Sequence, residues 1–161
     1  MKILMSLILT ACLMGCVSTP AAAPNPVNMN NFADGAGKDW KLLEISIESA
    51  FNREIVFDRK TLVKEGSGEI FTMKFDAEMI SGVAAPNRYS GPYTLGENRA
   101  ITLTAPMRST LMASLFQPEK LPEHEFFGYM QNIYEWRPAN GNLEFLSKTE
   151  NGREVRIIFG Q

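Results

Sequence analysis

Apolar and polar residues alternate along many short segments of the chain after residue 39. The clearest example is Phe71, Met73 and Phe75, which alternate with Thr72 and Lys74. A period of two residues is typical of a strand with one buried face. The same kind of pattern predicts further strands at residues 43–47, 54–58, 79–80, 101–103, 134–136, 143–145 and 155–159.

Turn signals separate these predicted strands. Residues 64–68 are rich in glycine and charge, residues 95–99 predict a hairpin turn, and Asn140-Gly141 suits a tight turn that needs a positive φ. Residues 81–93 hold two glycines, two prolines and two tyrosines between two strand-like segments. We expect a tight irregular segment there, which sets the bend between two strands.

Two segments predict helices. Ser109 or its neighbour can cap a short helix over residues 110–116, which Pro118 would stop. Pro122 is well placed in the first turn of a second helix, because its fixed φ suits that position. The acidic and apolar residues that follow fit the start and one face of this helix: Glu123, Glu125, Phe126, Met130 and Ile133.

Short strands, tight turns and a helical interlude predict a mainly β fold, α+β by count. We expect a small antiparallel sheet that curls and closes partly or wholly into a barrel, with one or two packed helices. Residues 39–161 form one predicted domain, long enough for a single core, and the sequence holds no repeat.

The first 15 residues predict a signal peptide, with Lys2 before an apolar run that is too short to span a bilayer as a helix. Residues 13–16 resemble a bacterial lipobox that ends at Cys16, which predicts lipid modification of this cysteine. Residues 9–12 are a rival lipobox ending at Cys12, which we keep as the reserve site. Because Val17 rather than an aspartate follows Cys16, we expect an anchor in the outer membrane.

Residues 16–38 predict a flexible tether, since prolines and small polar residues interrupt any periodic apolar pattern. Both cysteines lie in the signal region, so the predicted domain has no internal disulfide. The formal net charge is −2 and the pI is about 5.5, so the chain lacks the basic surface that nucleic acids require. We therefore expect no nucleic-acid partner.

The sequence holds no recognised catalytic motif, neither Gly-x-Ser-x-Gly nor His-Glu-x-x-His. His124 is the single histidine, and its acidic neighbours point in different directions around a helix, so we predict neither a metal site nor a cofactor. Asn87 suits a structural turn. Arg88, Tyr89 and Tyr93 could line a binding rim, and Gly82 and Gly91 suit close packing or special backbone angles.

These features occur in a particular order: a glycine-asparagine loop, a Thr-x-Met-Ala sequence, an acidic and aromatic helix, and two closing strands. The matching residues are Gly82, Asn87, Arg88, Tyr89, Gly91 and Tyr93 in the loop, then Thr110 and Met112. This order resembles the META domain, the HslJ-like family of bacterial envelope proteins, from residue 40 to residue 159. The resemblance implies a small β-barrel-like domain, often exported or lipid-anchored and linked to envelope stress, with no agreed biochemical activity.

The chain departs from the family at two positions. The family frequently has a cysteine just before the asparagine and another after Met-Ala, where this chain has Pro86 and Ser114. The absence of both cysteines together is the pattern expected when a disulfide has been lost. It argues against any redox role that the resemblance implies.

Together these observations predict a non-enzymatic binding or structural module, lipid-anchored to the envelope and facing the periplasm. Its partner is an envelope protein or a small ligand. The alternative is a carrier or sensor of a small apolar ligand inside the barrel, and a hydrolytic enzyme comes third. An interior filled by Phe71, Phe75, Leu103, Phe145 and Ile157 would leave the carrier without a site.

Overall fold

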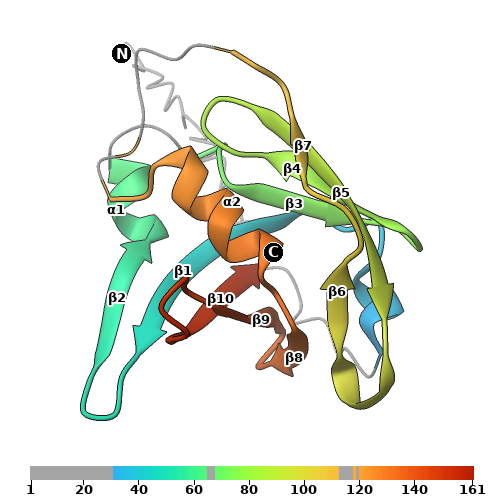
Figure 1. Cartoon of the computed structure of the whole chain (residues 1–161). Helices are drawn as coiled ribbons and strands as arrows, with labels where there is room; N and C mark the ends of the chain where they lie inside the picture. Colours follow the sequence, from blue (N-terminus) through green and yellow to red (C-terminus); the bar gives the residue numbers. More distant parts are fainter. Residues whose placement is uncertain (1–30, 65–67, 113–117, 119) are drawn as a thin grey trace, which may run out of the picture.

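The computed structural model describes residues 31–64, 68–112, 118 and 120–161. The described part folds around one antiparallel sheet (Figure 1). Its strands are β1 (Trp40–Glu48), β2 (Arg53–Asp58), β3 (Thr72–Phe75), β4 (Met79–Val83), β5 (Arg88–Leu95), β6 (Ile101–Leu103), β7 (Arg108–Ser109), β8 (Glu135–Ala139), β9 (Asn142–Lys148) and β10 (Glu154–Gly160). Its helices are α1 (Arg59–Lys64), α2 (Glu123–Gln131) and the 3-10 turns η1 (Phe32–Gly35) and η2 (Glu97–Arg99).

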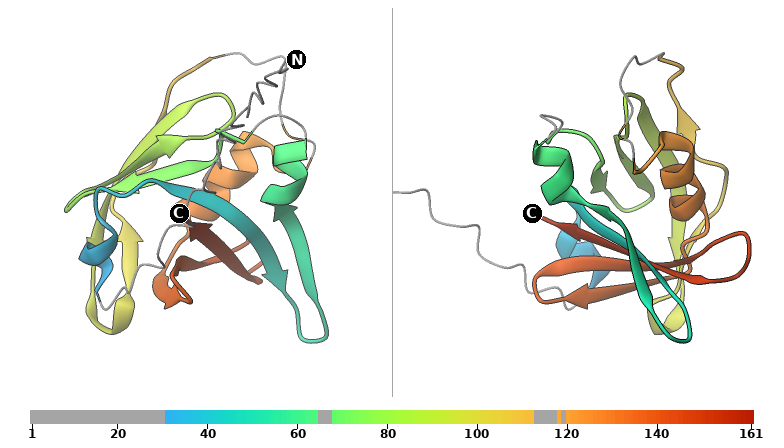
Figure 2. Two further views of the ribbon diagram at one scale, coloured as in Figure 1. Left: turned by 180° about the vertical axis from the view of Figure 1, so that it is seen from behind. Right: turned by 90° about the vertical axis from the view of Figure 1, so that its left-hand side faces the viewer.

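The sheet is strongly curled but not closed. Its strand order is β6-β5-β4-β3-β1-β10-β9-β8, with β2 paired to β1 and β7 paired to β5. The two edge strands approach each other at a single bridge between Ala100 and Glu135. Figure 2 shows the two halves of the sheet wrapping around a common interior. The mainly β, antiparallel and barrel-like fold expected from the sequence is confirmed, with an incomplete seam between β6 and β8.

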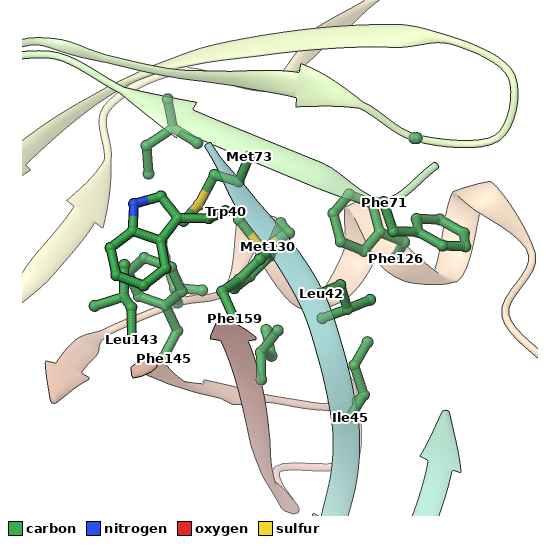
Figure 3. Close-up of a cluster of buried hydrophobic side chains, with 14 of the residues drawn as sticks. Trp40, Leu42, Ile45, Phe71, Met73, Phe126, Met130, Leu143, Phe145 and Phe159 are labelled. Carbon is green, nitrogen blue, oxygen red and sulfur yellow. The ribbon is translucent and has the colours of Figure 1, made fainter. Parts of the chain in front are cut away.

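The interior of the curled sheet is filled with apolar side chains (Figure 3). The five positions chosen to test for a ligand cavity are all buried, with exposed fractions of 0–8%: Phe71, Phe75, Leu103, Phe145 and Ile157. Close packing at these positions occupies the space in which an apolar ligand would lie.

The packed part of the chain begins earlier than the hydrophobic pattern predicts. Phe32 lies in η1, within the predicted tether, yet only 2% of its surface is exposed. Its ring stacks on Phe75 at 4.2 Å between centroids and meets Trp136 at 5.3 Å. The indole N–H of Trp40 donates to the carbonyl oxygen of Gly35 at 3.1 Å, which fixes η1 against β1.

The first predicted helix is wrong over the residues that can be compared. Ser109 belongs to β7 and pairs with Tyr89 of β5, and residues 110–112 are not helical. The Thr110 N–H donates to the Arg88 carbonyl oxygen at 3.0 Å, so pairing with a distant strand replaces the local capping that the sequence favours. The remainder of the predicted helix, residues 113–117, lies outside the described residues.

Strand β1 departs from the simple alternation. The register shifts between Leu42 and Glu44, so that Leu42 faces the core and Leu43 is only half-buried. In a regular strand over residues 43–47, Leu43 would share the buried face with Ile45 and Ile47. A bulge of this kind changes the face that each following residue occupies.

Helix α1 lies between the predicted strand at residues 54–58 and the turn signal at residues 64–68, where the sequence predicted no element. Its first residue, Arg59, is 9% exposed, and its guanidinium donates to the carbonyl oxygens of Leu42, Gly68, Ile70 and Phe71. Burial lowers the pKa of Arg59. This side chain therefore joins β1 to the segment that enters β3.

Helix α2 is confirmed, with Pro122 at its N-cap, but it ends at Gln131, so Ile133 lies beyond its C-cap. Phe126 and Met130 are fully buried, and the ring centroids of Phe126 and Phe71 are 5.1 Å apart (Figure 3). Neither helix seen in the described ranges is long and apolar enough to cross a membrane.

Candidate functional site

The stretch 81–93 is more regular than its composition suggests. Strand β4 continues to Val83, β5 begins at Arg88, and only residues 84–87 form the turn between them. The N–H of Ala84 donates to the carbonyl oxygen of Asn87 at 2.7 Å, which closes the turn. The predicted bend between two strands is therefore present, as a hairpin.

Asn87 lies at the centre of a hydrogen-bond cluster and is 6% exposed. Its Oδ1 accepts from the Thr110 hydroxyl at 2.8 Å and from the Met112 N–H at 2.7 Å. Its Nδ2 donates to Glu123 Oε2 at 2.7 Å and to the Met112 carbonyl oxygen at 3.4 Å. Three of the predicted site residues, Asn87, Thr110 and Met112, thus meet in space.

Glu123 is the member of this cluster that the sequence pattern did not connect to Asn87. Its Oε1 accepts from the backbone N–H groups of Ala85 at 3.0 Å and Asn87 at 2.8 Å. A carboxylate at the start of α2 is also favoured by the helix dipole. Glu123 therefore holds the hairpin turn and the start of α2 together, although 36 residues separate it from Asn87.

The predicted rim residues do not gather on one surface. Tyr89 is 3% exposed and its hydroxyl donates to the Thr72 carbonyl oxygen at 2.9 Å, and burial raises its pKa. Tyr93 is 7% exposed and its hydroxyl donates to the carbonyl oxygen of Asp76. Arg88 is exposed on the other side of the strand. The two tyrosines thus join β5 to β3 and the turn after it.

The two glycines of the motif permit close contacts. A Cβ on Gly82 would lie 2.0 Å from the carbonyl oxygen of Thr72, which no side chain can tolerate. A Cβ on Gly91 would lie 3.1 Å from Cγ of Met107. Close approach of β4 to β3 therefore requires glycine at position 82, as the sequence-based interpretation favoured.

The buried side chains of the motif have no unpaired polar atom. The buried side-chain nitrogen and oxygen atoms of the described residues all have hydrogen-bond partners. Within the same residues, histidine, cysteine, aspartate and glutamate side chains do not group in threes that could hold a metal ion. The Asn87 cluster can lock three segments together, but it offers no unpaired donor for chemistry.

Exposed polar side chains line a groove on the outer surface. A groove of about 380 Å³ lies between α2 and the hairpin that joins β9 and β10, and its lining includes His124, which follows Glu123 of the Asn87 cluster. Its lining is His124, Glu125, Gly128, Tyr129, Asn132, Lys148, Thr149, Glu150 and Asn151. The sequence did not single out this groove, because its two walls come from segments about 20 residues apart.

The fold and the Asn87 cluster define a small, curled β-sheet domain in which a hairpin turn is locked to a helix. The chain belongs to the META domain family, whose model matches residues 36–158. The resemblance stated from the sequence is therefore confirmed over most of the chain.

Two solved structures are similar. An NMR structure of a protein from Burkholderia xenovorans has a TM-score of 0.53 and 16% identity, over 92% of this chain and 99% of that one. A crystal structure of a DUF4847 family protein from Bacteroides vulgatus ATCC 8482 has a TM-score of 0.49 and 17% identity, over 78% and 93%. No curated protein matches the sequence. At this identity, the first structure supports the fold alone.

Proposed function

We propose that this META-domain protein is a non-enzymatic binding module, lipid-anchored to the cell envelope. The observation that carries the proposal is the engagement of the family-motif side chains with one another and with backbone groups. Apolar side chains fill the interior in addition. Recognition of a partner is therefore assigned to the outer surface, and the interior serves stability.

The anchor in this proposal is Cys16, with Cys12 in reserve, and residues 1–15 are its signal peptide. These residues lie outside those the structure describes. Lipid chains contribute about 0.8 kcal/mol for each buried CH₂, and more than one chain gives stable attachment. The expected location is the outer membrane, with the domain facing the periplasm.

Fractionation of cells that express Cys16→Ala tests the anchor. We expect this variant to move from the membrane fraction to the soluble fraction, whereas Cys12→Ala should stay with the membrane. The opposite result would assign the lipid to Cys12, and membrane retention of both single variants and of the double variant would reject lipid anchoring.

The binding role is tested by chemical crosslinking in intact envelopes, followed by identification of the species that crosslink to the full chain. A reproducible partner or envelope component that an unrelated lipoprotein does not capture would support the module. Recovery of none, under normal growth and under envelope stress, would contradict it. Turnover of a hydrolysable substrate by the purified chain would instead support the enzymatic alternative.

A further inference from the structure

A trough runs along the outer surface between α2 and the hairpin that joins β9 and β10. It consists of the 380 Å³ groove and an adjoining hollow of about 530 Å³, which is lined by Asn132, Tyr134, Lys148, Thr149 and Glu150. The two hollows share four residues, so they form one elongated surface. The right-hand view of Figure 2 shows α2 above this hairpin.

Gly128 leaves the α2 side of the trough without a side chain at this position. It is the sixth residue of α2, where glycine costs about 0.5–1 kcal/mol relative to alanine. A Cβ at this position would have no heavy atom within 4 Å, and the backbone is not in the left-handed region. Neither packing nor backbone geometry requires glycine here. The missing side chain leaves room for a molecule lying against the helix.

The trough also carries polar side chains that are not engaged. Within the described part of the chain, His124, Glu125, Glu150 and Asn151 make no side-chain hydrogen bond or ion pair, and all four are exposed. The buried polar groups around Asn87, by contrast, are fully paired. Donors and acceptors that converge on a hollow without internal partners are the groups that can orient a ligand.

The charge and polarity of the lining narrow the class of ligand. Glu125 and Glu150 disfavour an anion, and Lys148 disfavours a polycation while its ammonium lies 5.4 Å above the ring of Tyr134. Among the described residues that line the trough, none is leucine, isoleucine, valine, methionine or phenylalanine, which disfavours a lipid. A neutral molecule rich in hydroxyl groups remains, because the asparagine amides both donate and accept and the carboxylates accept.

Two half-buried tyrosines are spaced along the trough. Tyr129 lines the first hollow and Tyr134 the second. Burial, and then the nearby Glu125 carboxylate, raise the pKa of Tyr129. Aromatic rings offer an apolar platform with a polar tip, which suits the C–H face and the hydroxyl edge of a sugar ring.

We propose that the trough between α2 and the β9–β10 hairpin binds a short neutral oligosaccharide. The proposal rests on the surface binding role put forward above and names its ligand. Tyr129 packs on one sugar ring, and the next ring lies beside Tyr134, whose ring carries the Lys148 ammonium and whose hydroxyl donates to Glu154 at 3.0 Å. Glu125, Asn132, Glu150 and Asn151 hydrogen-bond to the hydroxyl groups. Its elongated, open shape fits a chain of sugars rather than a compact molecule.

The test is titration of the ¹⁵N-labelled full chain, held in a polyoxyethylene detergent, with chitotriose and with maltotriose. We expect one trisaccharide to shift the amide signals of residues 124–132 and 148–151, with an affinity that does not change with salt. Gly128→Leu should weaken binding about tenfold or more and keep an equal or higher melting temperature.

Ala77→Leu adds the same side chain at an exposed turn outside the trough, and it should bind like wild type. Three results would overturn the oligosaccharide: no shift with either sugar, unchanged binding by Gly128→Leu, or salt-sensitive binding of spermidine alone. If the titration fails and the envelope crosslink persists, only the oligosaccharide is rejected. Failure of both rejects the binding module as well.

Discussion

Asn87 is the residue whose replacement separates a structural role from a binding role. Asn87→Ala removes the acceptor for the Thr110 hydroxyl and the Met112 N–H, and the donor to the Glu123 carboxylate. We expect a clear loss of stability with little change in the native fold. The hairpin turn keeps its Ala84–Asn87 backbone bond, because that bond uses no side-chain atom.

The size of the loss follows from the bonds that are removed. Two neutral hydrogen bonds contribute about 1 kcal/mol each, and one to a carboxylate contributes about 1.5–3 kcal/mol. Thr110 and Met112 are exposed and Glu123 is only half-buried, so water replaces part of what is lost. We therefore expect the free energy of unfolding to decrease by about 3 kcal/mol. A decrease of this size lowers the melting temperature by roughly 10 °C.

Urea denaturation followed by circular dichroism measures this change, with the slope against urea used to check that unfolding stays two-state. Asn52→Ala is the matched control, since Asn52 is exposed and its side chain makes no hydrogen bond within the described residues. The control should change stability by less than about 0.5 kcal/mol. An Asn87→Ala loss equal to that of the control would refute the role of the cluster.

Two further predictions concern backbone approach and acid stability. Gly82→Ala should destabilise the domain by about 3 kcal/mol or more, because its Cβ would meet the Thr72 carbonyl oxygen. Gly128→Ala should instead stabilise the domain by up to about 1 kcal/mol. Thermal melts of the two variants measure these changes, and equal losses of stability would contradict the prediction. Backbone N–H groups lower the folded-state pKa of Asp76 below its ordinary value of 3.8, so its contribution is present above that value and lost as pH falls through the folded pKa. Urea midpoints between about pH 2 and pH 5 should therefore fall less steeply in Asp76→Asn than in wild type, and parallel curves would contradict the assignment.

The elements that the sequence predicted best are those whose signal is local. The alternation from Phe71 to Phe75 became β3 and the residue before it, and Asn140-Gly141 became a turn with positive φ at both residues. Helix α2 followed from Pro122 and the spacing of Phe126 and Met130. In each case the residues that decide the conformation are near neighbours in the sequence.

The features that sequence reasoning missed depend on distant partners. Ser109 and Thr110 favour a helix start, but backbone bonds to β5 hold them beside that strand, and the Met112 N–H bonds to the Asn87 side chain. The bulge after Leu42 follows from the register with β10, and Arg59 finds its acceptors on segments 9 to 17 residues away. Glu123 likewise reaches Asn87 only in the folded chain. The lipid anchor and the envelope location stay predictions.

The strand order also decides when this domain can fold. The first strand, β1, lies in the middle of the sheet, and its principal neighbour is the last strand, β10. A chain emerging from a ribosome therefore exposes Trp40, Leu42 and Ile45 for as long as residues 154–160 are missing. Contacts between such distant segments slow folding, since a long loop must close before they form. Completion of the core is consequently delayed until residues 154–160 have been synthesised and can pair with β1.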